Sequence, residues 1–133
     1  MLNHREIYTK VSSALVEALS VAEEDVKPAA TLQGDLGAES IDFLDIVFRL
    51  EREFGLHIPR DEPFPEAIFD GDPNFVHNGK VTARGLVELR ARLPFAELTK
   101  FEQNPDFQAI SNLFTVEMVV RYIQRKLNEP AAV

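Results

Sequence analysis

The chain has 133 residues, a length that fits one domain of the commonest size. Its 22 acidic side chains against 14 basic ones give a net charge of −8. That balance argues against nucleic acid as a partner, because phosphate binding uses clustered Lys and Arg. The absence of cysteine excludes disulfides, thiolate metal sites and a protein thiol nucleophile. Any thiol chemistry would have to come from an attached group.

The first residues show neither a targeting segment nor a membrane segment. Residues 1–6 are charged and helix-forming, and they lack the apolar core of a signal peptide. No apolar run approaches the ~20 residues that a transmembrane helix needs. We therefore expect a cytoplasmic protein without membrane insertion.

The negative charge is concentrated in one segment. Residues 22–45 hold seven carboxylates against Lys27 alone, a net charge of −6, whereas residues 79–133 carry a net charge of +2. A charge cluster is by itself most often a solvated face. It indicates a docking surface for basic partners only where a second feature lies in the same segment.

A helix and a long connection are predicted at the start of the chain. Asn3 and Glu6 form a capping-box signature, and residues 5–19 repeat apolar side chains on one helical face. The connection over residues 21–39 is long for a compact domain, so it should be held to the core. Its spaced apolar anchors are Val26, Leu32 and Leu36.

A second helix is predicted from Ser40 or Ile41 to Phe54. Ser40 is expected to be its N-cap, Asp42 suits its first turn, and Gly55 supplies its stop. The apolar face of this helix comprises Phe43, Ile46, Val47, Leu50 and Phe54.

The middle of the chain predicts irregular structure. Prolines and a glycine in residues 60–78 exclude a long helix or a central strand. Asn78 followed by Gly79 is a tight-turn signal, which favours a small hairpin between residues 75–76 and 80–81.

Helices are expected again toward the C-terminus. Thr82 should cap a helix that runs to about residue 92, and a short helix is expected at residues 95–101. Thr115 should cap the last helix, with Phe114 and Val119 as a hydrophobic staple. The fold class predicted is an all-α domain of four or five helices around one core.

Metal and catalytic motifs are not supported. Residues 70–74 resemble the start of a calcium loop, which requires Gly at its sixth position and Glu at its twelfth. Phe75 and Val81 occupy those positions. The three histidines are scattered, and no nucleophile–base pair or phosphate loop is present, so we expect neither a metal site nor catalytic residues.

Ser40 is the candidate site. A serine at a helix N-terminus is usually structural. Here, however, the run Asp35-Leu36-Gly37-Ala38-Glu39-Ser40-Ile41-Asp42 puts a hydroxyl at a loop-to-helix junction, inside the acidic segment and after an anchored loop. Another protein could approach such a junction.

These residues resemble the signature of the acyl carrier protein family, small acidic helical bundles with Asp-Leu-Gly-Ala-Asp-Ser-Leu-Asp before a helix that ends in Glu-Phe and is followed by Ile-Pro. The chain matches with residues 35–42 and then with Glu53-Phe54 and Ile58-Pro59. The resemblance covers about residues 1–59 without a gap in spacing. It implies a four-helix bundle of the acyl-carrier kind.

The resemblance also implies a function. Ser40 matches the serine that receives 4′-phosphopantetheine from coenzyme A, so the chain would carry acyl chains as thioesters and would be a cosubstrate rather than an enzyme. The implied partners are a phosphopantetheinyl transferase and ketosynthases, acyltransferases or acyl-activating enzymes, and a monomer is expected. The implied docking residues are Glu39, Ile41, Asp42, Asp45 and Phe48.

The sequence departs from the family pattern in three ways. Glu39 replaces the usual Asp, and Arg49 and Arg52 interrupt the acidity of the second helix. An insertion of about 50 residues, at about residues 60–113, separates the second helix from the last. We therefore expect one domain, residues 1–133, whose insertion adds a helical layer.

The insertion and the start of the second helix indicate a resemblance to one subgroup of the family. Phe43-Leu44-Asp45-Ile46, with the segment at residues 76–82, resembles specialised carriers of very long acyl chains in lipid A assembly. Two alternatives stay open: a carrier-like interaction domain without the prosthetic group, and a peptidyl or aminoacyl carrier.

Overall fold

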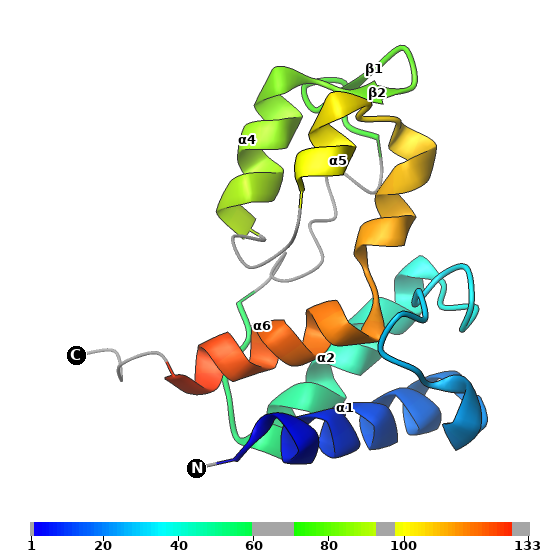
Figure 1. Ribbon diagram of the computed structural model, residues 1–133, viewed down its shortest axis with the longest axis vertical. Coiled ribbons are helices and arrows are strands. Elements are labelled where there is room, and N and C mark those ends of the chain that lie inside the picture. Colours follow the sequence, from blue (N-terminus) through cyan, green and yellow to red (C-terminus); the bar gives the residue numbers. More distant parts are fainter. Residues whose placement is uncertain (1, 60–70, 93–97, 129–133) are drawn as a thin grey trace.

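The computed structural model describes residues 2–59, 71–92 and 98–128, which form two layers (Figure 1). The first, which we call the three-helix layer, contains α1 (His4–Leu19), α2 (Ser40–Phe54) and α6 (Val116–Asn128). The second, the inserted layer, contains β1 (Val76–His77), β2 (Lys80–Val81), α4 (Ala83–Arg92), α5 (Thr99–Gln103) and the 3-10 helix η2 (Phe107–Leu113). The chain enters the inserted layer after α2 and returns through η2 to α6.

The three-helix layer forms as the apolar periodicity predicts. Asn3 and Glu6 make the predicted capping box at the start of α1, and Gly55 ends α2 with a φ of 65°, in the left-handed region that glycine adopts at no steric cost. All three helices contribute fully buried side chains, among them Ile7, Val11, Leu15, Ile46, Leu50, Val119 and Ile123.

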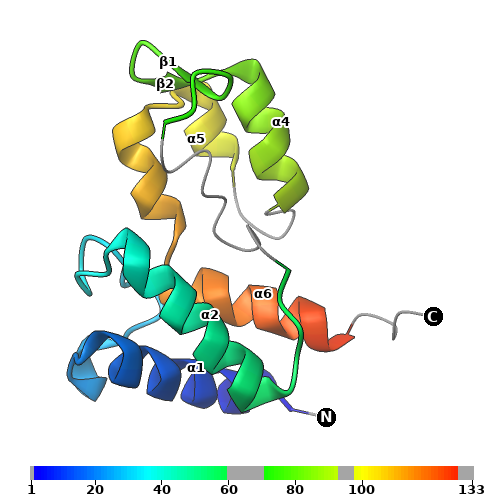
Figure 2. The ribbon, with the colours of Figure 1, turned by 180° about the vertical axis from the view of Figure 1, so that it is seen from behind.

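Helix α6 is buried over an unusually wide part of its circumference. Val119 and Ile123 are fully buried, and Met118 and Tyr122 are buried as well, although they point more than a quarter-turn away. In both ribbon views α6 crosses α2 and lies on the side of α1 that faces the inserted layer (Figures 1 and 2). The last helix directly follows η2, so the chain returns from the inserted layer into α6.

The long connection between α1 and α2 is held down, as its anchors predict. Val26, Leu32 and Leu36 are all buried. The backbone N–H of Leu32 donates to the carbonyl of Phe114 at 2.9 Å, and the N–H of Val116 donates to the carbonyl of Ala30 at 3.0 Å. The connection therefore pairs with the start of α6, and it contains only one short helical turn, η1 (Glu23–Asp25).

The inserted layer is organised by the predicted hairpin. Val76 pairs with Val81 and His77 with Lys80 in an antiparallel ladder. The backbone then adds a third segment, because the N–H of Val81 donates to the carbonyl of Pro105 at 2.7 Å and the N–H of Phe107 donates to that of Gly79 at 2.8 Å.

Two details of the local predictions need correction. The N-cap of α2 is Glu39, and Ser40 is the first helical residue. In the region of the short helix expected at residues 95–101, the described helix α5 instead spans Thr99–Gln103, and residues 93–97 lie outside the described part of the chain. The 3-10 helix η2 was not anticipated.

The fold class is confirmed as helical, with only the two-stranded hairpin as sheet among the described residues. A further helix of a four-helix bundle would follow α2, where residues 60–70 lie outside the described part. No helix in that part is long and apolar enough to cross a membrane.

Candidate functional site

A compact turn positions the residues before Ser40. The N–H of Thr31 donates to the Asp35 carboxylate at 2.9 Å, and the N–H of Asp35 donates to the Thr31 hydroxyl at 3.0 Å. The N–H of Ala38 then donates to the carbonyl of Leu32 at 2.8 Å. Gly37 has a φ of 73°, so a side chain there would strain the turn. These bonds fix the path by which the chain enters α2.

Ser40 is the first residue of α2, and its neighbours along the chain are accessible. Glu39 is exposed, and Ile41 is 77% exposed, so the residues on both sides of Ser40 face solvent. The Asp42 carboxylate accepts a hydrogen bond of 2.8 Å from the N–H of Glu39, which closes the first turn. This reciprocal contact explains why the cap lies one residue earlier than predicted.

An apolar stripe runs along the exposed face of α2. Ile41, Leu44 and Phe48 are 77%, 61% and 54% exposed and lie three and four residues apart, so they line up on one face. Exposed large apolar side chains in such a row are typical of interaction sites. Leu44 was not among the predicted docking residues, although its spacing from the predicted Ile41 and Phe48 could have identified it.

The predicted docking residue Asp45 is engaged within the molecule. Arg49 Nε donates to both Asp45 carboxylate oxygens, at 3.1 and 3.2 Å. Arg49 Nη1 donates to Glu17 Oε2 on α1 at 3.0 Å. One guanidinium thus bridges two carboxylates from two helices. The partnership with Glu17, which is 32 positions away along the chain, had no signal in the sequence.

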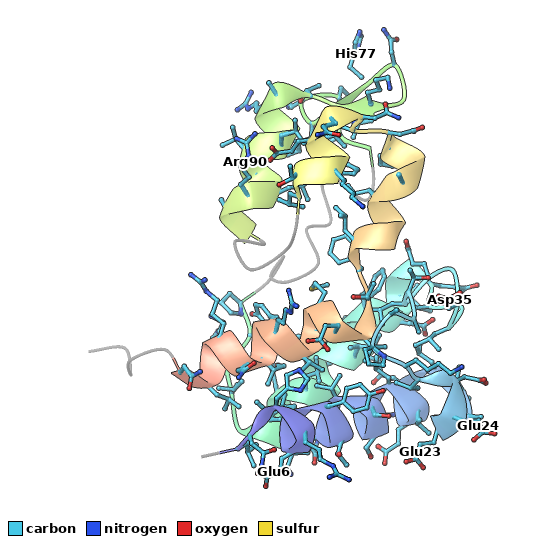
Figure 3. All side chains as sticks on the ribbon, viewed as in Figure 1. Glu6, Glu23, Glu24, Asp35, His77 and Arg90 are labelled. Atoms are coloured by element: carbon cyan, nitrogen blue, oxygen red, sulfur yellow. The ribbon has the colours of Figure 1, made fainter. Side chains whose placement is uncertain are left out.

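Acidic side chains gather at the end of the three-helix layer where α2 begins. Figure 3 shows Glu23, Glu24 and Asp35 on this side of the molecule, whereas Arg90 and His77 lie in the inserted layer. Arg90 is paired with Glu102 there. The structure therefore brings the acidic segment and Ser40 to the same end.

Tyr8, a group with a shifted pKa, lies outside this site. Burial, with a smaller contribution from the charge of Glu117, raises the pKa of Tyr8 above its ordinary value. The Tyr8 hydroxyl donates to the carbonyl of Val26 at 2.7 Å. Its role is thus to fasten the connection to α1.

A helical bundle that presents a serine at an anchored loop-to-helix junction, beside acidic and apolar exposed residues, has the arrangement of a small carrier domain. Comparison with known proteins agrees with this class. Residues 9–63 match the family model described as a phosphopantetheine attachment site.

Two individual relatives are named acyl carrier proteins. The chain is 41% identical over 82 residues to an acyl carrier protein of Thermosynechococcus vestitus (strain NIES-2133 / IAM M-273 / BP-1), a match that covers 62% of this chain and 100% of that protein. It is 40% identical over 55 residues to the acyl carrier protein AcpXL of Rhizobium meliloti (strain 1021), which covers 41% of this chain and 58% of that protein.

The chain therefore belongs to the acyl carrier protein family. Its prosthetic group is 4′-phosphopantetheine, and its class is a carrier rather than a catalyst.

Proposed function

We propose that Ser40 is the residue to which 4′-phosphopantetheine is attached, and that the protein presents acyl chains to enzymes of fatty acid or other lipid biosynthesis. The observation that carries the proposal is the position of Ser40. It is the first residue of α2, it follows the hydrogen-bonded turn at residues 31–38, and it lies between the exposed Glu39 and Ile41.

The local structure fits the group chemically. A serine hydroxyl forms a phosphodiester, and a phosphodiester at residue 40 would lie at the positive end of the α2 dipole. When bound, the group supplies a terminal thiol that holds acyl chains as thioesters, a function that this cysteine-free chain lacks. In the attachment, the Ser40 oxygen bonds to phosphorus, coenzyme A loses adenosine 3′,5′-bisphosphate, and a base of the transferase takes the hydroxyl proton.

The surface around Ser40 suits transient docking of partner enzymes. We assign Glu39, Ile41, Asp42, Asp45 and Phe48 to this surface, together with Leu44, because they lie on or beside the exposed face of α2. Exposed carboxylates accelerate encounters with basic partners, and apolar side chains then contribute contact area. The partners are a phosphopantetheinyl transferase and the ketosynthases, acyltransferases or acyl-activating enzymes that load and unload the carrier.

We treat residues 1–133 as one carrier domain in which the segment at about residues 60–113 is an insertion. The continuity of the three-helix layer supports this division, because α1 packs against both α2 and α6. The backbone hydrogen bond from Leu32 to Phe114 also joins segments on either side of the insertion.

Intact-mass spectrometry tests the attachment. Incubation with coenzyme A and a promiscuous phosphopantetheinyl transferase should add about 340 Da to the wild type and nothing to Ser40→Ala. Ser13→Ala is the matched control, because Ser13 is an exposed serine on α1 and its loss should leave the addition intact. A wild type that stays unmodified with several transferases contradicts the proposal, and an addition that persists in Ser40→Ala moves the site elsewhere.

A further inference from the structure

The exposed face of α2 changes character along its length. Its N-terminal end carries the exposed Glu39, its middle carries the apolar stripe of Ile41, Leu44 and Phe48, and one turn beyond Phe48 lies the exposed Arg52. Asp45 borders the stripe, since it follows Ile41 by four residues and precedes Phe48 by three. Among these side chains, Asp45 is the carboxylate that a partner would meet beside the middle of the helix.

Arg49 neutralises that carboxylate. Its Nε lies 3.1 and 3.2 Å from the two Asp45 oxygens, and its Nη1 lies 3.0 Å from Glu17. The Arg49 side chain is 32% exposed, less than Asp45 at 46% or Glu17 at 65%, so the guanidinium lies between its two partners rather than extended into solvent. A planar guanidinium suits this bridging position in a way that a lysine ammonium does not.

We propose that Arg49 is a specificity-determining residue of this carrier, because it holds Asp45 in an intramolecular ion pair and so limits the carboxylates that α2 offers to basic partner enzymes. A cation on an approaching enzyme must compete with Arg49 for Asp45 and is repelled by the guanidinium itself. Enzymes that require negative charge along the whole helix are disfavoured. Enzymes that combine an apolar patch with acidic groups facing Arg52 are favoured. This inference rests on the proposed function and deepens it.

The expected effect is moderate in size. A single exposed ion pair is a weak interaction, and the charge at a docking surface acts mainly on the association rate. Releasing Asp45 should therefore raise kcat/KM with a transferase of basic docking surface about twofold to fivefold at low ionic strength.

A double-mutant cycle tests the inference, with transfer from coenzyme A to the protein measured by intact mass. Arg49→Gln should raise kcat/KM for the transferase, and the gain should shrink as salt is added. Asp45→Asn should lower kcat/KM more in the Arg49→Gln background than in the wild type, because only there is the carboxylate released. Equal effects of Asp45→Asn in both backgrounds overturn the proposal.

Two further variants separate docking from structure. Lys10→Gln is the matched control, because Lys10 pairs with Glu53 at 3.1 Å across the same two helices, and its loss changes the net charge equally. Glu17→Gln loosens the link to α1 but leaves Arg49 on Asp45. Neither should raise kcat/KM, and a gain in either variant as large as that of Arg49→Gln would assign the effect to net charge or to loosened packing.

The proposed function and this inference fail in different ways. If no variant and no wild-type protein gains mass, the attachment at Ser40 is wrong. If all proteins gain mass at the same rate whatever stands at position 49, the attachment holds and the role of Arg49 is wrong. Thermal melts of each variant show whether α1 and α2 remain packed. They distinguish a transfer rate that is lower because packing is lost from one that is lower because docking is weaker.

Discussion

The two layers of the molecule are stabilised in different ways. In the three-helix layer, long amphipathic helices bury rows of side chains such as Ile7, Val11 and Leu15 against one another. In the inserted layer the described elements are short, and the backbone pairs in a hairpin extended by Pro105 and Phe107. The first is stabilised mainly by apolar burial, and the second combines buried side chains such as Leu89 and Phe101 with specific hydrogen bonds and close approaches.

The two layers also differ in whether they contain residues of the family signature. The family signature, including Ser40, lies in the connection between α1 and α2, in α2 itself and in the segment directly after α2. The described elements of the inserted layer contain none of them. Substitutions that destabilise the inserted layer should therefore leave phosphopantetheine attachment at Ser40 intact, whereas substitutions that destabilise the three-helix layer should impair it.

The largest expected effect comes from a cavity in each layer. Leu50 on α2 and Leu89 on α4 are both fully buried, so Leu50→Ala and Leu89→Ala should each cost about 2–5 kcal/mol of local stability. Only Leu50→Ala should slow phosphopantetheine transfer to Ser40, because it loosens α2. Denaturant unfolding and intact-mass kinetics measure the two effects. Equal loss of transfer in both variants would show that the layers are functionally coupled.

A close approach in the inserted layer gives the next prediction. A Cβ added at Gly85 would lie 2.5 Å from the carbonyl oxygen of Phe75 and 2.6 Å from Val81 Cγ1. Gly85→Ala should therefore push α4 away from the hairpin at a cost of about 1–3 kcal/mol.

Limited proteolysis should then cut the inserted layer faster while α1 and α2 keep their amide protection. Val87→Ala is the control on the same helix, because Val87 is 59% exposed. If Gly85→Ala also releases the amides of α1, the separation of the two layers is refuted.

Removing a helix cap in either layer should have a smaller and more local effect on stability. The Thr115 hydroxyl accepts from the N–H of Met118 at 3.1 Å, and the Thr82 hydroxyl accepts from the N–H of Gly85 at 3.1 Å. Replacing either threonine by alanine should cost about 1 kcal/mol. Hydrogen exchange should rise in α6 for Thr115→Ala and in α4 for Thr82→Ala. A rise in the other layer would contradict local control by the caps.

The same contrast explains what the sequence could predict. The helices α1, α2 and α6 were foreseeable because their apolar periodicity and caps are local properties of the chain. The placement of α5 and η2 was not, because it depends on bonds such as that from Phe107 to Gly79, which sequence spacing does not reveal.

The candidate site shows the same limit. Ser40 and its acidic neighbours followed from a contiguous motif, but the capping role of Glu39 depends on its contact with Asp42, which competes with the usual preference for serine as a cap. The pairing of Arg49 with Glu17 required two helices to be packed first. Contiguous patterns were predictable, and tertiary contacts between them were not.

The smallest expected effect is a pH dependence confined to the three-helix layer. The raised pKa of Tyr8 means that the folded protein keeps the phenolic proton where the unfolded chain begins to lose it. The stability from this group is therefore complete below about pH 10 and decreases as the pH rises through the folded-state pKa.

At neutral pH Tyr8→Phe should cost about 1 kcal/mol, because the hydrogen bond to Val26 is lost. The difference between wild type and Tyr8→Phe in denaturant unfolding should then narrow as the pH rises above about 10. A difference that stays constant or widens at high pH would mean that ionisation of Tyr8 is not coupled to the packing of α1 against the connection.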